Sequence, residues 1–88
     1  MNITVLTPDA KIFEGEIKSV KVPGTSGQFQ VLKNHAAIVS SLENGTVTIK
    51  QASGADFTFD IESGFIEVLN NEIALLIQGV SNLPATEA

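Results

Sequence analysis

Apolar and polar residues alternate along most of this chain, and this alternation is the feature that most constrains its fold. In residues 56–62, Phe57, Phe59 and Ile61 fall on one face of an extended strand and polar residues on the other. No segment shows the 3.6-residue period of an amphipathic helix. We expect further strands in residues 2–6, 11–13, 16–22, 37–42, 46–50, 65–69 and 72–78 and around residues 29–31. The sequence therefore predicts an all-β protein, a β-sandwich of about ten short strands in two sheets.

Short turn signals separate these segments. Asn44-Gly45 is the strongest hairpin signal, and it predicts that the segments before and after it pair with each other. Asn70-Asn71 can supply two residues with positive φ for another hairpin. A change of phase between Ile17 and Val20 indicates a β-bulge near Lys18-Ser19. Further turns are expected at Pro8-Asp9, Glu14-Gly15, Ser53-Gly54 and Ser63-Gly64.

The central stretch around Pro23-Gly24 carries the most information. This pair suits a type II turn, because proline presets φ at the first corner and glycine accepts positive φ at the second. Gly27 lets the backbone turn again before the next apolar strand. We therefore expect a strand that ends in an exposed double turn, followed by a strand that returns. His35, the only histidine, follows the returning strand.

The last expected strand differs from the others because both of its faces are apolar. Ile73, Leu75 and Ile77 alternate with Ala74 and Leu76. One face is expected in the core, and the other under a neighbouring element or a partner. After this strand we expect the sandwich to end near residue 80, with residues 81–88 as a short polar tail that frays from residue 82.

Composition and charge exclude several classes of protein. With 88 residues, 43% of them hydrophobic, the chain suffices for one domain with its own core. The absence of cysteine excludes disulfides and thiol chemistry. Ten acids against five lysines give a net charge of −5, so no nucleic-acid partner is expected. No apolar run approaches the roughly 18 residues that cross a bilayer, and no signal peptide opens the chain, so no direct membrane insertion is expected.

No catalytic or metal-binding constellation is visible, and neither a cofactor nor enzymatic activity is expected. His35 lacks a patterned nucleophile or carboxylate partner, and a hydrogen bond across a turn or an interface role is the favoured interpretation. Asp60 and Glu62 share a strand face, which is more often solvated than an acid/base pair. The Gly24-x-x-Gly27 loop lacks the Gly-Lys-Ser/Thr ending of a phosphate loop. Core positions are expected for the five phenylalanines, at residues 13, 29, 57, 59 and 65.

Three motifs occur in order from about residue 3 to residue 79. The first is Val5-x-x-Pro8-Asp9-x-x-Ile12-Phe13-x-Gly15. The second is Pro23-Gly24-x-x-Gly27, followed by Phe29-x-Val31-Leu32-x-x-His35-Ala36 and Leu42-x-x-Gly45. The third is Gly64-Phe65-Ile66-Glu67-Val68. Together, in this order and spacing, they resemble the epsilon subunit of F-type ATP synthases.

The resemblance implies a non-catalytic subunit of the rotor. In that family an N-terminal β-sandwich of two five-stranded sheets docks on the gamma subunit and faces the polar loops of the ring of membrane-embedded, proton-carrying subunits. A C-terminal helical hairpin follows, which can inhibit ATP hydrolysis. This chain matches the sandwich only, so the resemblance implies coupling of rotation to ATP synthesis without that inhibition. It also implies a peripheral position in the ATP synthase, on the cytoplasmic face of the cell inner membrane.

The resemblance also assigns residues to the two partners. The ring-facing loop corresponds to Gly24, Thr25, Ser26, Gly27 and Gln28, and many members carry an acid where this chain has Gln28. His35 and Ala36 match the family's gamma-contact region. The two residues before the histidine are commonly Pro-Gly, and here Lys33-Asn34 replaces them; Asn34 can still adopt the left-handed conformation of that turn.

Two other classes of function stay open from the residues. One is a free-standing β-sandwich binding module, for example for a saccharide, although the tryptophan and tyrosine usual at sugar platforms are absent. The other is a small enzyme that uses His35 with an Asp or Glu, although no sequence motif supports such a catalytic group.

Overall fold

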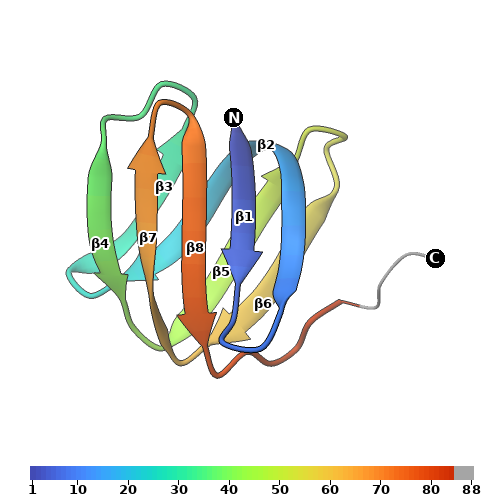
Figure 1. The fold of residues 1–88 in the computed structure, drawn as a ribbon, viewed down its shortest axis with the longest axis vertical. Coiled ribbons are helices and arrows are strands. Elements are labelled where there is room, and N and C mark those ends of the chain that lie inside the picture. The colour runs from blue at the N-terminus through green and yellow to red at the C-terminus, as the bar shows by residue number, and fades with distance from the viewer. Residues whose placement is uncertain (85–88) are drawn as a thin grey trace.

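The computed structural model describes residues 1–84, which contain eight strands and no helix (Figure 1). The strands are β1 (Asn2–Leu6), β2 (Lys11–Gly24), β3 (Gly27–Leu32), β4 (Ile38–Leu42), β5 (Gly45–Gln51), β6 (Asp56–Ile61), β7 (Ser63–Leu69) and β8 (Glu72–Gln78). They form one continuous hydrogen-bonded ladder that folds over into two layers (Figure 1). The front layer contains β4, β7, β8, β1 and the start of β2, and the back layer contains β3, the rest of β2, β5 and β6. The predicted β-sandwich is confirmed, with eight strands instead of about ten.

One long strand accounts for much of the difference in strand number. β2 runs for 14 residues without the turn predicted at Glu14-Gly15. Its first part pairs with β1, and its second part pairs with β3 and β5. Its register with β5 shifts between Ile17 and Ser19, which confirms the bulge predicted near Lys18-Ser19. A bulge bends a strand and increases its twist, so β2 can belong to both layers.

Asn44-Gly45 does not form the predicted hairpin. β4 pairs with β7, whereas β5 pairs with β2 and β6, so this connection carries the chain from the front layer to the back layer. Neither residue has the positive φ of the expected turn. A Cβ on Gly45 would lie 2.7 Å from the Cβ of Pro23. Close packing, and not turn geometry, therefore explains this glycine.

The other turn predictions mostly agree with the structure. Asn70 and Asn71 have φ of 50° and 64° and join β7 to β8 as a hairpin. Gly54 has φ of 98° in the β5–β6 turn. The bend predicted at Ser63-Gly64 is wrong, because both residues already belong to β7. The break between β6 and β7 falls on Glu62 instead.

The core lies between the two layers and consists of aliphatic side chains with one phenylalanine. Its buried members are Ile3, Val5, Ile17, Val20, Val22, Val31, Leu42, Val47, Ile49, Phe59, Ile61, Ile66, Val68, Ile73, Leu75 and Ile77. Phe13, Phe29 and Phe57 are half-buried against this cluster. The core position expected for Phe65 is wrong, because its side chain is 55% exposed on the outside of the front layer.

Candidate interaction surface

The β2–β3 turn is a tight two-residue connection. Gly24 pairs with Gly27, so Thr25 and Ser26 alone form the exposed turn. Positive φ occurs at Gly27 (126°) and not at Gly24, so the type II turn predicted at Pro23-Gly24 is wrong: both residues lie inside β2. Gly24 is buried, and a Cβ there would lie 2.7 Å from the Gly27 carbonyl oxygen.

The tip of this turn is fixed to the end of β4. The Thr25 backbone N–H donates to the Ser41 carbonyl oxygen at 3.1 Å. Gln28, the last residue of the predicted ring-facing loop, is exposed at the start of β3 and pairs with Pro23. The loop therefore presents Thr25, Ser26 and Gln28 to solvent on a short, well-held hairpin.

His35 lies half-buried in the connection between β3 and β4, and Ala36 beside it is exposed. The His35 backbone N–H donates to the Leu32 carbonyl oxygen at 3.1 Å and closes the turn. Its ring Nδ1 lies 2.7 Å from the Ala36 carbonyl oxygen. The histidine is therefore bonded within its own turn, one of the two roles that the sequence favoured.

A pair of asparagines fixes this connection to the β7–β8 hairpin. Asn34 has φ of 67°, the left-handed conformation that the sequence allowed. Its backbone N–H donates to Asn71 Oδ1 at 2.7 Å, and Asn71 Nδ2 donates to Asn34 Oδ1 at 3.1 Å. The two residues are 37 positions apart, so sequence reasoning had no signal for this link.

Replacing Asn71 by glycine tests this link, because glycine accepts the positive φ and removes only the side chain. The two lost hydrogen bonds contribute about 0.5–1.5 kcal/mol each, so we expect Asn71→Gly to destabilise the protein by about 1–3 kcal/mol. Hydrogen exchange measured by NMR should show a faster-exchanging Asn34 amide. Asn70→Gly is the matched control at the neighbouring positive-φ position. If the Asn34 amide exchanges at the same rate in both variants, the prediction is contradicted.

The two predicted contact regions do not come together. The Thr25-Ser26 turn lies beside the end of β4, whereas His35 lies before its beginning (Figure 1). The length of β4, about five residues of extended chain, therefore separates them. One small domain can thus present two separate contact regions at opposite ends.

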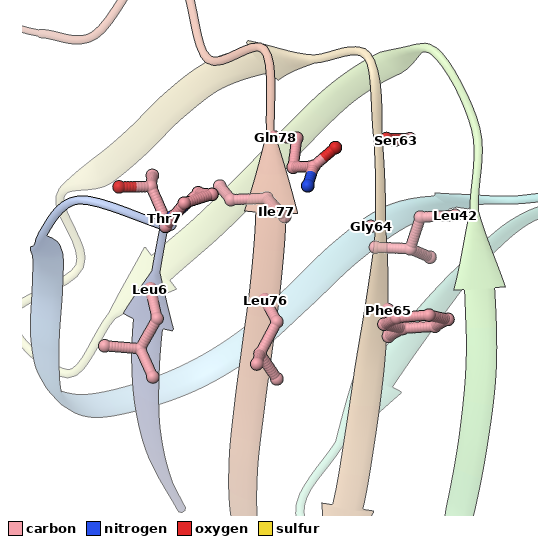
Figure 2. A pocket seen from close by; sticks show the side chains of 10 residues that line it. Leu6, Thr7, Leu42, Ser63, Gly64, Phe65, Leu76, Ile77 and Gln78 are labelled. Carbon is pink, nitrogen blue, oxygen red and sulfur yellow. The ribbon is translucent and has the colours of Figure 1, made fainter.

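The outer face of the front layer carries an apolar row near the end of β4, where Phe65 pairs with Ser41. The strand register aligns Leu6 with Leu76 and Leu76 with Phe65, across β1, β8 and β7. Figure 2 shows these three side chains side by side on one face of the sheet. Phe65 is 55% exposed and Leu76 is 45% exposed. They border a hollow of about 500 Å³, whose lining also includes Leu42 and Gly64.

One feature of the sequence indicated this row. The apolar outer face of residues 72–78 predicted a covering element or a partner, and Leu76 belongs to that face. Among residues 1–84, no other strand or loop covers it. The contributions of Leu6 and Phe65 were missed, because only the pairing of three strands aligns them with Leu76.

A separate polar cluster surrounds Asp60 on the back layer. The Thr46 hydroxyl donates to Asp60 Oδ1 at 2.7 Å, and Asn82 Nδ2 donates to Asp60 Oδ2 at 2.6 Å. The backbones of Asp60 and Ser81 exchange two hydrogen bonds of 3.0 Å. The hydroxyl of Thr46, and then the amide of Asn82, lower the pKa of Asp60.

This cluster bears on two expectations. Asp60 lies on an exposed sheet face and is not paired with Glu62, as the sequence favoured, and both of its oxygens accept hydrogen bonds from other residues. Asn82 was expected to fray, and instead its side chain is bonded to Asp60. Residues 85–88 of the predicted tail lie outside the described residues.

The lowered pKa predicts a pH dependence of stability. A carboxyl whose folded-state pKa is depressed stabilises the fold above its unfolded pKa, near the ordinary 3.8, and loses that contribution as the pH falls through the folded value. We therefore expect Asp60→Asn to unfold at lower urea concentration than the wild type at neutral pH, with the difference shrinking in acid. Urea titrations at several pH values measure this difference. If the two proteins differ in stability by the same amount at every pH, the ionised Asp60 carboxylate is not the source of the difference.

Within the described residues, no three His, Cys, Asp or Glu side chains are grouped to hold a metal ion. No helix in residues 1–84 could cross a membrane.

Comparison with known proteins identifies the family. The profile described as "ATP synthase, Delta/Epsilon chain, beta-sandwich domain" matches residues 1–82. The chain belongs to this family. Its relatives include the ATP synthase epsilon chain of Chlorobaculum tepidum, 42% identical over 79 residues that cover 90% of each chain. The epsilon chain of Campylobacter jejuni is 40% identical over 79 residues, which cover 90% of this chain and 61% of the relative.

Two chains from solved ATP synthase structures share the fold. A chain of the Euglena gracilis mitochondrial ATP synthase, solved as OSCP/F1/c-ring, superposes with a TM-score of 0.83 at 20% identity. That match covers 90% of this chain and 51% of the Euglena chain, so this chain spans about half of it. A chain of the Tetrahymena thermophila central stalk and c-ring superposes with a TM-score of 0.73 at 18% identity, covering 91% of this chain and 64% of the other.

Proposed function

We propose that this protein is a non-catalytic rotor subunit of an F-type ATP synthase that links the gamma subunit to the membrane ring and transmits rotation. The membership of residues 1–82 in the delta/epsilon family carries the proposal. The relatives are named epsilon chains, and the structural neighbours come from assemblies that contain the c-ring. The proposed location is peripheral, on the cytoplasmic face of the cell inner membrane, as part of that synthase.

The geometry of the sandwich supports this role. A coupling element must pass torque without deforming, and eight strands in one continuous ladder around an aliphatic core form a stiff body. The β2–β3 turn projects from one end of β4 with its tip fixed by a hydrogen bond to Ser41. A preorganised turn loses little conformational entropy on binding. Thr25, Ser26 and Gln28 are the proposed ring contacts, by neutral hydrogen bonds.

The gamma subunit is the second proposed partner. His35 and Ala36 lie in a connection that the Asn34–Asn71 pair fixes to the β7–β8 hairpin. The same front layer carries the uncovered apolar row, and exposed apolar rows of this kind are typical of protein contacts. The His35 connection lies at the start of β4, whereas the row lies level with Ser41 near its end, so the proposed gamma contact rests on His35 and Ala36.

Co-purification with tagged gamma subunit of the same organism tests the proposal. We expect the wild-type chain to be retained at equal stoichiometry, and His35→Ala to be retained less. Gln28→Ala, at the opposite end of β4, is the control that should leave gamma binding unchanged. Failure of the wild type to bind folded gamma overturns the proposal and leaves a β-sandwich that binds another partner.

A further inference from the structure

The back layer ends in an edge strand, β6. Within residues 1–84, β5 is the only strand that pairs with it. In an antiparallel edge strand, the backbone groups of alternate residues point away from the sheet. Such groups are a template on which another chain can pair, unless something covers them.

Residues 79–82, which we term the strap, cover one end of this edge. Gly79 has φ of 69°, a conformation that suits glycine, and it leads the chain from the end of β8 into the strap (Figure 1). The backbones of Asp60 and Ser81 then exchange two hydrogen bonds of 3.0 Å, as the residues of two paired strands do. The strap therefore occupies the outward backbone groups of Asp60.

Two side chains of the strap strengthen this contact. Asn82 Nδ2 donates to Asp60 Oδ2 at 2.6 Å, and Asn82 itself has φ of 59°. Val80 is half-buried against the core of the sandwich. Asp60 thus holds the strap through both its backbone and its carboxylate, while Val80 covers part of the core beside it.

The rest of the β6 edge is open and acidic. Thr58 lies two positions before Asp60, and Asp56 two positions before Thr58, so their backbone groups point to the same outer side. Suppose that the β6 strands of two copies paired antiparallel about Thr58. Asp56 of each copy would then lie opposite Asp60 of the other, and like charges in this position are destabilising.

We propose that the strap is an edge guard, which keeps two copies of this chain from pairing through their β6 strands. Release of the strap would free the backbone of Asp60 to extend the open edge formed by Thr58 and Asp56. It would also uncover the apolar surface under Val80. A second copy is the fitting occupant, because an antiparallel pair of β6 strands is symmetric and each copy supplies the same groups. This property belongs to the sandwich itself and does not depend on the proposed function.

The double variant Ser81→Pro with Asn82→Gly releases the strap. Proline lacks the N–H that donates to the Asp60 carbonyl oxygen, and glycine accepts the positive φ of residue 82 without the side-chain amide. We expect the Asp60 amide to exchange with solvent about tenfold faster or more, because hydrogen bonds that hold the strap are lost. The Ile61 amide, in the ladder with β5, should stay protected. Asn70→Gly, at another exposed asparagine with positive φ, is the control.

Sedimentation equilibrium at several protein concentrations measures the expected self-association. The wild type and Asn70→Gly should keep the mass of one chain, 9.3 kDa. The double variant should approach twice this mass as its concentration rises, and more so at high salt, which screens the facing Asp56 and Asp60. Addition of Thr58→Pro should restore the mass of one chain, because proline removes an outward N–H and is tolerated on an edge strand.

Each other outcome overturns a defined part of the inference. If the Asp60 amide exchanges at the wild-type rate in the double variant, these hydrogen bonds do not hold the strap. If it exchanges fast while the protein keeps the mass of one chain at every concentration, the strap is not a guard. Association that persists with Thr58→Pro excludes β6 as the pairing edge. Should urea unfolding show that the double variant has lost its fold, Asn82→Gly alone gives the same test with a smaller effect.

Discussion

Phe59→Ala is expected to destabilise the protein by about 3–5 kcal/mol, the usual cost of truncating a buried phenylalanine. Phe59 is 1% exposed and is the largest fully buried side chain. It pairs with Val47 across the β5–β6 ladder, and its ring lies 5.7 Å from that of Phe57 in an edge-on arrangement. Its removal leaves a cavity between two layers whose strands are fixed by the ladder, so the site collapses only in part.

Urea unfolding followed by circular dichroism measures this loss. Small domains have total stabilities of about 5–15 kcal/mol, so the variant should be close to unfolded at low denaturant. Phe65→Ala is the matched control, since the same atoms are removed from a ring that is 55% exposed. We expect this control to lose less than about 1 kcal/mol. Similar losses in the two variants contradict the assigned burial.

Gly64→Ala is expected to cost about 1–3 kcal/mol through overpacking. A Cβ at Gly64 would collide with the backbone carbonyl oxygen of Leu76 and lie 2.9 Å from the Ile77 Cγ2 atom. These atoms belong to the adjacent strand β8, which pairs with β7 along its whole length. The backbone cannot move aside as a flexible side chain would, so the two strands must separate locally.

Thermal unfolding measures this effect, with about 4–8 °C of melting temperature lost per kcal/mol in a domain of this size. Gly15→Ala is the control, because a Cβ there would meet only the Phe13 ring at an ordinary 3.9 Å. Removing a glycine from an unstrained position stabilises proteins by about 0.4–1 kcal/mol. We therefore expect opposite signs for the two substitutions, and a stable Gly64→Ala variant would contradict the close approach of β7 and β8.

Local patterns predicted most of the strands and several turns. The alternation in residues 56–62 predicted β6 with its buried face, and Asn70-Asn71 predicted the β7–β8 hairpin. The phase change after Ile17 predicted the bulge in β2. These predictions succeed because side-chain alternation, turn conformation and bulges depend on residues close together in the sequence.

Pairing between distant strands could not be predicted in this way. Asn44-Gly45 favours a hairpin locally, but β4 gains a partner in β7 and β5 gains partners in β2 and β6. The glycine pattern around Pro23-Gly24 likewise resembles a turn, although Gly24 is a strand residue in close contact with Gly27. In both places tertiary packing overrides a local preference.

The sequence by itself determined that the chain is an all-β sandwich of the delta/epsilon family, since alternation and motif spacing are properties of the linear chain. Only the tertiary structure decided which side chains share a surface. Phe65, which was expected in the core, lies on the outside of the sheet and is aligned with Leu76 and Leu6. The tertiary structure also joined Asn34 to Asn71. Such groupings depend on strand register and layer assignment, which arise from long-range pairing and are not encoded in any single segment.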